Sequence, residues 1–329
     1  MAESTAPAAT TRAERRPPAP LRLLSVIPTP YLLIAAPLII LSVVLLWPII
    51  QMVWYSLSDY TLPDLARGDA PEWNNFEHYR QLLTDAEFWT IFRNTVLVVI
   101  AMVAGVLTLG TLVGLLLHKL PRWFSTVVAT GMMLAWATPQ ISASLIYRWL
   151  FLPERGLVNY TLANFPEWLV GTRWGEFWTT FNWFLQPLSL FTILAMIIIW
   201  QGFPFVAVTV LAGLKSVPYE LYEAARVDGA SAWRQFWSIT YPVLRPLFAL
   251  LLVLQIIWNF RIFTQLYILA GGFQNRDVYL LSYYIYQQGF RDNPPDYGMG
   301  SALAVTMTIL ILIVSAYYLR MMIRQGETR

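Results

Sequence analysis

The feature that most constrains this chain is a series of six long apolar segments. They lie at about 31–54, 94–117, 125–150, 188–212, 246–270 and 300–319. A helix needs about 20 apolar residues to cross a bilayer, and inside it every backbone polar group must be hydrogen-bonded within the protein. We therefore predict an all-α polytopic membrane protein with six transmembrane helices. Internal prolines such as Pro37, Pro139 and Pro204 do not exclude a span, because packed neighbours can satisfy the freed carbonyl groups.

Composition excludes several classes of protein. The chain is 57% hydrophobic and 12% charged, whereas a soluble domain carries about 25% charged residues. It has no cysteine and two histidines, His78 and His118, far apart in sequence. Disulfides, thiolate chemistry and a histidine-rich metal centre are therefore not expected. We predict neither a catalytic site nor a metal site.

The charges predict the topology. Of the 22 Lys and Arg residues, 13 fall in the two tails and in the segments after the second and fourth spans, and six fall in the other three connecting segments. Of the 19 acidic residues, 13 lie on the basic-poor side. By the positive-inside rule both termini are cytoplasmic. The basic side then faces the anionic inner leaflet, which explains the net charge of +3 without nucleic-acid binding.

Three segments of the chain follow from this pattern. Residues 1–27 are predicted to be a disordered basic cytoplasmic tail, residues 28–320 the six-helix transmembrane domain, and residues 321–329 a cytoplasmic tail. On the outside, segments 55–93, 151–187 and 271–299 are expected to form short interfacial helices. The second of these carries four tryptophans, Trp168, Trp174, Trp178 and Trp183. They mark the membrane interface or, alternatively, stack on a sugar ring.

The loop 213–246 is the most informative polar stretch. Pro218 can begin a short helix, and Asp228-Gly229 can end it, since glycine tolerates the left-handed conformation of a helix C-terminus. Ser231 can cap a second helix, which places Trp233, Phe236, Trp237 and Thr240 on one stripe. The pattern predicts two short helices at the cytoplasmic surface. They form either an amphipathic pair resting on lipid or a docking element for a partner.

The order of residues in this loop resembles the EAA signature of importer-type ABC transporter permeases. The matched residues are Glu223, Ala224, Ala225, Asp228, Gly229, Ala230, Phe236, Ile239, Pro242 and Pro246. Val217 and Tyr241 depart mildly from the usual pattern. Further stretches are similar to the first permease of sugar importers, the branch of the maltose and glycerol-phosphate permeases: Phe260-Arg261-Ile262-Phe263, Gly271-Gly272 and Tyr297-Gly298. Thr264 and Phe273 depart from that branch. The resemblance covers roughly residues 28–320.

The resemblance implies a complex in a bacterial plasma (inner) membrane. Its partners would be a second permease subunit, a cytoplasmic ABC ATPase dimer and an extracellular or periplasmic solute-binding protein. The chain has no phosphate-binding loop, so ATP and Mg would be bound by the partner ATPase and no cofactor by this chain. The loop residues from Glu223 to Phe236 would dock on the ATPase, with Glu223 paired to one of its basic residues. We expect Gly229→Asp to uncouple transport while the protein remains inserted.

The fifth span carries the polar residues expected along a substrate path. Gln255, Trp258, Asn259 and Ile262 share one helical face, and buried polar groups in a membrane usually face a cavity. The resemblance implies that they line a sugar site together with Gly202 and Phe205 of the fourth span. The alternative is that Gln255 and Asn259 hydrogen-bond neighbouring helices. Arg261 is the single basic residue available to such a cavity, and it either snorkels or pairs with an acid of the partner permease.

These observations leave three functions open. The first is a permease subunit of a carbohydrate importer, for a di- or oligosaccharide. The second is an importer permease for glycerol phosphate or another non-sugar solute, which would use Arg261. The third is a membrane-embedded transferase, which would need clustered acids or histidines at a bilayer edge, whereas no predicted span contains an acidic residue.

Overall fold

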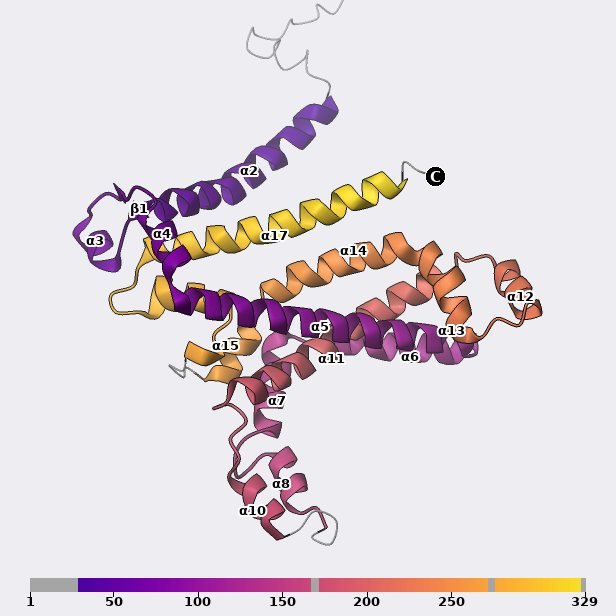
Figure 1. The fold of residues 1–329 in the computed structure, drawn as a ribbon. Helices are drawn as coiled ribbons and strands as arrows, with labels where there is room; N and C mark the ends of the chain where they lie inside the picture. Colours follow the sequence, from indigo (N-terminus) through magenta and orange to yellow (C-terminus); the bar gives the residue numbers. More distant parts are fainter. Residues whose placement is uncertain (1–28, 167–171, 272–275, 327–329) are drawn as a thin grey trace, which may run out of the picture. The chain divides into compact units, whose positions relative to one another are not determined.

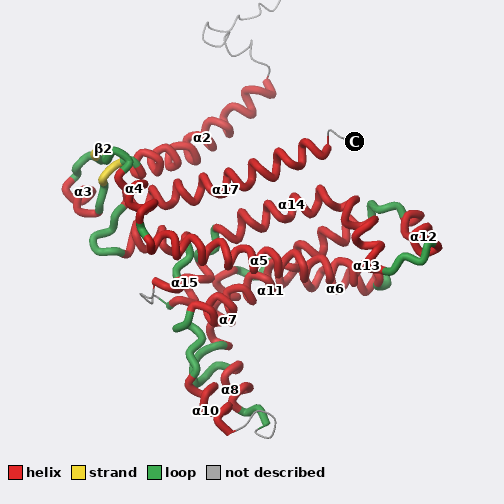
Figure 2. The backbone as a smooth tube through the Cα atoms, viewed as in Figure 1, coloured by secondary structure: helices red, strands yellow, loops and turns green. Residues whose placement is uncertain are grey.

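The computed structural model describes residues 29–166, 172–271 and 276–326. The whole of the predicted N-terminal tail, the end of the C-terminal tail, Trp168, Gly272 and Phe273 lie outside the described residues. The chain divides into two compact units, Met1–Met52 and Val53–Arg329. Helix α2 (Thr29–Ser56) makes up the described part of the first unit and continues into the second. Figure 1 shows the order of the helices, and Figure 2 shows that nearly all the described secondary structure is helical.

Five of the described helices are long and apolar enough to cross a membrane. They are α2, α5 (Ala86–Lys119), α11 (Pro187–Leu214), the continuous stretch Ala232–Phe260 that ends with α14 (Tyr241–Phe260), and α17 (Tyr297–Gly326). The all-α polytopic prediction is confirmed. The first, second, fourth and sixth predicted spans are each a continuous helix.

The third predicted span is not one helix. It consists of α6 (Arg122–Trp136) and α7 (Gln140–Leu150), separated at residues 137–139. Pro139 supplies no backbone N–H and disfavours the helical conformation at Thr138, so the ladder stops there. The carbonyl of Thr138 is not left unpaired, because the side-chain amide of Gln201 on α11 donates to it at 3.1 Å.

The fifth predicted span is also wrong in its bounds. Helix α14 begins at Tyr241, directly after a π-helical turn, η1 (Phe236–Thr240), and ends at Phe260. Its last turn tightens, with the amide of Arg261 donating to the carbonyl of Trp258 at 3.3 Å. A separate short helix, α15 (Thr264–Ala270), follows and ends at Gly271 with φ +59°. Arg261, Thr264 and Gln265 interrupt the apolar run at this break, but apolar residues resume through Ala270 and no proline or glycine marks the end of α14.

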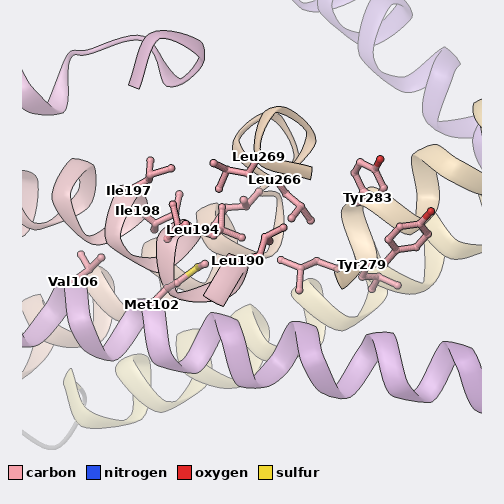
Figure 3. Close-up of a cluster of buried hydrophobic side chains, with 14 of the residues drawn as sticks. Met102, Val106, Leu190, Leu194, Ile197, Ile198, Leu266, Leu269, Tyr279 and Tyr283 are labelled. Carbon is pink, nitrogen blue, oxygen red and sulfur yellow. The ribbon is translucent and has the colours of Figure 1, made fainter. Parts of the chain in front are cut away.

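The core of the second unit is built on α5 and α11, which lie side by side (Figure 1). Met102 and Val106 of α5 meet Leu190, Leu194, Ile197 and Ile198 of α11, and Leu266 and Leu269 of α15 complete the cluster (Figure 3). Two glycines allow this close approach. A Cβ atom added at Gly110 would lie 2.6 Å from Val206, and one at Gly114 would lie 2.8 Å from the carbonyl oxygen of Ala207. Small residues have this role between membrane helices.

Gly114→Val should therefore destabilise the protein. The atom it would meet first is backbone, which cannot rotate away, and overpacking of this kind costs about 1–3 kcal/mol. We expect a lower midpoint of thermal unfolding in detergent and a smaller monodisperse peak in size-exclusion chromatography. Gly131→Val on α6 is the matched control, since a Cβ atom there meets nothing within 4 Å. An unchanged midpoint for Gly114→Val would contradict the close packing.

The three segments that were predicted to lie outside the membrane form small substructures with short helices. Residues 55–93 contain α3 (Leu62–Arg67), α4 (Glu77–Thr84) and a two-stranded antiparallel sheet that the sequence did not indicate, β1 (Ser58–Asp59) with β2 (Glu72–Trp73). The pKa of Asp64 is lowered because the hydroxyl and amide of Thr61 donate to its carboxylate. The third outer segment contains a 3-10 turn (Arg276–Val278), α16 (Leu281–Tyr286) and a π-helical turn (Gln287–Arg291).

Three of the four predicted tryptophans pack together in the second outer segment. It contains α8 (Leu157–Ala163) and α10 (Thr172–Thr180). Trp178 stacks on Trp183 with ring centroids 5.2 Å apart, and Trp174 donates its indole N–H to the carbonyl of Leu162 at 2.8 Å. The indole N–H of Trp183 donates to the side-chain oxygen of Asn159 at 2.5 Å. This packing explains their clustering, and a role in lipid or sugar contact stays a prediction.

Candidate functional site

The loop between α11 and α14 folds as two short helices around a glycine. Figure 1 shows the two helices, α12 (Tyr219–Val227) and α13 (Ala232–Gln235). Pro218 precedes α12, and Ser231 caps α13, since its hydroxyl accepts from the amide of Arg234. Between them Gly229 has φ +70°. The corner is closed by hydrogen bonds from the Gly229 amide to the Arg226 carbonyl and from the Ala230 amide to the Ala225 carbonyl. The predicted helix pair is confirmed.

The predicted docking residues lie together on this corner. Glu223, Ala224, Asp228 and Gly229 are exposed. The remaining three, Ala225, Ala230 and Phe236, are partly buried beneath them. Within the described part of the chain the carboxylate of Glu223 has neither a hydrogen bond nor an ion pair. The corner thus presents the unpaired carboxylate of Glu223 beside the small side chain of Ala224, and Asp228 and the apolar side chain of Val227 are exposed near it.

A hydrogen bond connects this corner to the start of α14. The hydroxyl groups of Tyr222 on α12 and Thr240 on η1 lie 2.8 Å apart, and Thr240 is buried. The turn η1 passes without interruption into α14. A displacement of α12 would therefore be carried directly to the helix that holds Gln255 and Asn259. The sequence indicated both residues as parts of the loop, but the contact between them could not be read from their spacing.

A cavity of about 460 Å³ lies where α6, α7, α11, α14 and α15 meet. Five of the six predicted substrate-path residues line it: Gly202, Gln255, Trp258, Asn259 and Ile262. Phe205 does not line the cavity. It packs on Trp136, at 5.7 Å between ring centroids, and on Trp258, at 5.4 Å. Ile262 reaches the cavity from the turn after α14, so the predicted continuous helical face was wrong at that position.

Two of the cavity amides are incompletely hydrogen-bonded. Asn259 donates to the backbone carbonyl of Gln255 at 2.7 Å and to its side-chain oxygen at 3.3 Å. Gln255 Nε2 and Asn259 Oδ1 have no partner, although the two residues are 2% and 3% exposed. Buried polar atoms normally have partners, and these two are available to a bound molecule. The alternative prediction was that these two side chains hydrogen-bond to neighbouring helices. The hydrogen bonds found for them are instead between Gln255 and Asn259 on the same helix.

The structure adds several lining residues that sequence reasoning missed. Thr138 and Gln140 flank the break between α6 and α7, Gln201 bridges that break, and Gln265 comes from α15. Each of these residues lies next to a helix interruption or contacts one. They could have been predicted only if the positions of the interruptions had been known.

Arg261 also lines the cavity. It is exposed at the C-terminus of α14, with no side-chain hydrogen bond or ion pair among the described residues. Arg148, by contrast, donates to the carbonyl of Ile268 at the end of α15 at 2.9 Å. The cavity therefore combines amides, indoles and one guanidinium, and no carboxylate or imidazole is among the residues that line it. Such a site can bind and orient a polar solute, but it lacks a general acid or base.

Comparison with known proteins gives a consistent result. Residues 107–326 match the family described as binding-protein-dependent transport system inner membrane component. The diacetylchitobiose uptake system permease protein DasB of Streptomyces coelicolor is 34% identical over 298 residues, 91% of this chain and 88% of that protein. The sulfoquinovosyl glycerol transport system permease protein SmoG of Agrobacterium fabrum is 35% identical over 291 residues, 88% of each chain.

A solved structure has the same fold. A chain in the crystal structure of a bacterial ABC transporter that imports the acidic polysaccharide alginate aligns with a TM-score of 0.73. The alignment covers 92% of this chain and 99% of that one, at 22% sequence identity.

Proposed function

Because the chain belongs to the family of binding-protein-dependent transport system inner membrane components, we propose that it is the permease of an ATP-driven importer of a di- or oligosaccharide. The family is one of transport components, so the chain moves a solute and does not transform it. The observation that carries the substrate class is the 460 Å³ cavity with its unpartnered amide atoms. Its size falls within the range of about 300–1,000 Å³ typical of small-molecule sites.

The lining chemistry suits a sugar. Gln255 Nε2 can donate to a hydroxyl oxygen and Asn259 Oδ1 can accept from a hydroxyl, while Trp258 offers an apolar face to a pyranose ring. The names of the two relatives give diacetylchitobiose and sulfoquinovosyl glycerol as their solutes. Both names describe saccharides or glycosides, and this supports the same substrate class here.

Arg261 favours a second candidate. Its guanidinium lines the cavity without an acidic partner among the described residues, and it could bind the anionic group of glycerol phosphate or of another charged solute. The single charge among several amides and indoles makes this the less favoured substrate.

The corner formed by α12, Gly229 and α13 is the proposed docking site for a cytoplasmic ABC ATPase dimer. Glu223 would pair with a basic ATPase residue, and the small Ala224 and Ala225 would permit a close approach. ATP and Mg would be bound on that ATPase. Closure of the ATPase would then move α12 and, through the Tyr222–Thr240 hydrogen bond, α14. The other partners would be a second permease and an external solute-binding protein, in a bacterial inner membrane with both termini of this chain cytoplasmic.

Uptake of a labelled panel of sugars and glycerol phosphate in a deletion strain tests this proposal. We expect one saccharide to be lost on deletion and restored by the wild-type gene but not by Gly229→Asp. Restoration of glycerol phosphate uptake alone would favour the second candidate. Unchanged uptake of every panel member would contradict the carbohydrate assignment.

A further inference from the structure

A second and larger cavity opens beside the docking corner. It measures about 920 Å³ and is lined by the end of α5, by α6, by the last turns of α11, and by Tyr219 and Tyr222 of α12. Since α12 lies at the same end of the molecule, this cavity is on the side of the proposed ATPase. The smaller cavity lies further along the same helices.

The two cavities share helix faces. On α6, Ser125, Ala129 and Met133 line the larger cavity, and Trp136, three residues further, lines the smaller one. On α11 the order runs from Ala212 and Val208 in the larger cavity to Gly202 in the smaller one. Residues three or four apart lie on one face of a helix, so each helix presents a continuous face to both cavities.

An aromatic cluster lies between the two cavities on these faces. Phe205 stands between Val208 and Gly202 on α11, lines neither cavity, and contacts Trp136 of α6 and Trp258 of α14. The Trp136–Phe205 rings are stacked at 21°, and the Phe205–Trp258 rings meet edge to face at 64°. These contacts close the direct route between the cavities along α6 and α11.

From this arrangement we infer that Trp136, Phe205 and Trp258 form the inner gate of the transport path, and that the larger cavity is its cytoplasmic vestibule. The inference rests on the proposed function. Each aromatic contact contributes about 0.5–1.5 kcal/mol, so the pair of contacts through Phe205 can hold the path closed and still be broken by a movement of α14. Trp258 is the gate member on α14, the helix that is joined to the docking corner through Tyr222 and Thr240.

The vestibule is basic. His118, Arg122 and Lys215 line it, and its lining includes no carboxylate. None of these three side chains has an ion pair within the described residues. An anionic molecule should therefore enter the vestibule faster than a cationic one of equal size.

Cysteine accessibility in the assembled complex tests the inference, because this chain has no native cysteine. The probe is an anionic, membrane-impermeant methanethiosulfonate applied to inside-out vesicles. Thr130→Cys reports on the vestibule and Gln140→Cys on the smaller cavity. Gly131→Cys is the matched control, because it lies at the same depth of α6, is rotated about 100° from Thr130 and does not line the vestibule. Modification is measured on this chain alone, so sugar uptake is not needed, and failure of the substrate assignment is distinguishable from failure of the gate.

We expect Thr130→Cys to react about tenfold faster than Gly131→Cys, and Gln140→Cys to react slowly until Phe205→Ala is added. The second change should then raise the Gln140→Cys rate about tenfold, which corresponds to about 1.4 kcal/mol of lost closure. Replacement of both Arg122 and Lys215 by glutamine should remove the preference for the anionic probe over a cationic one.

Equal rates at Thr130→Cys and Gly131→Cys would overturn the vestibule. If Phe205→Ala assembles poorly, Trp258→Leu serves instead, and a Gln140→Cys rate unchanged in an assembled gate variant would overturn the gate.

Discussion

Replacing Gly229 with valine will abolish uptake while the chain remains inserted and folded. Gly229 has φ +70°, a conformation that costs an L-amino acid about 1–2 kcal/mol and a β-branched residue more. Apart from the two adjacent residues, no atom in the described part of the chain lies within 4 Å of an added Cβ, so we expect the damage to be confined to the corner between α12 and α13 and to its docking partner. The measurement is uptake in the complemented deletion strain, with membrane insertion followed by immunoblot.

Gly229→Asn is the matched control, since asparagine adopts the left-handed conformation more readily than valine. We expect it to retain more uptake than Gly229→Val and to purify with more of the ATPase. Normal uptake with Gly229→Val would show that the corner does not couple ATP hydrolysis to transport.

The second large effect is expected from the cavity amides. Asn259→Leu removes the free Oδ1 acceptor and leaves Gln255 without its side-chain partner, so a bound sugar loses up to two hydrogen bonds. A net contribution of about 0.5–1.5 kcal/mol for each bond predicts a rise in the KM for uptake of about tenfold. Initial rates over a range of substrate concentrations provide the measurement.

Gln287→Leu is the control for burial. Gln287 is also buried and incompletely hydrogen-bonded, and its side-chain amide donates to the hydroxyl of Tyr279 at 2.6 Å. Gln287 does not line the cavity. Its replacement should lower thermal stability without changing KM. If Asn259→Leu behaved in the same way, with an altered melting temperature and an unchanged KM, the amide would be a packing residue and not a substrate ligand.

The sequence predicted the helical spans well because membrane burial imposes a length and a composition on each of them. Four spans were continuous as expected, whereas the third and fifth were interrupted. Pro139 was visible in the sequence, but whether its freed carbonyl has a partner depends on Gln201, 63 residues away in the chain. The end of α14 at Phe260 had no comparable signal, since apolar residues continue to Ala270.

The candidate site was predictable to the extent that it follows one helix. Gln255, Trp258 and Asn259 were found from their spacing on a single face, and all three line the cavity. Gln140, Gln201 and Gln265 come from three other helices, and their convergence is a property of the tertiary packing. Phe205 was assigned to the substrate path by resemblance alone, and its contacts with Trp136 and Trp258 suggest a different role, that of a barrier.

ATP-dependent accumulation of the panel sugar in proteoliposomes tests the central claim most directly. The complex would be purified by a tag on this chain and reconstituted with its binding protein outside and ATP inside. The account predicts that an ATPase copurifies, that the sugar accumulates with ATP and not with ADP, and that Gly229→Val abolishes accumulation. Equal accumulation with ATP and ADP, or a purified complex without an ATPase, would contradict it.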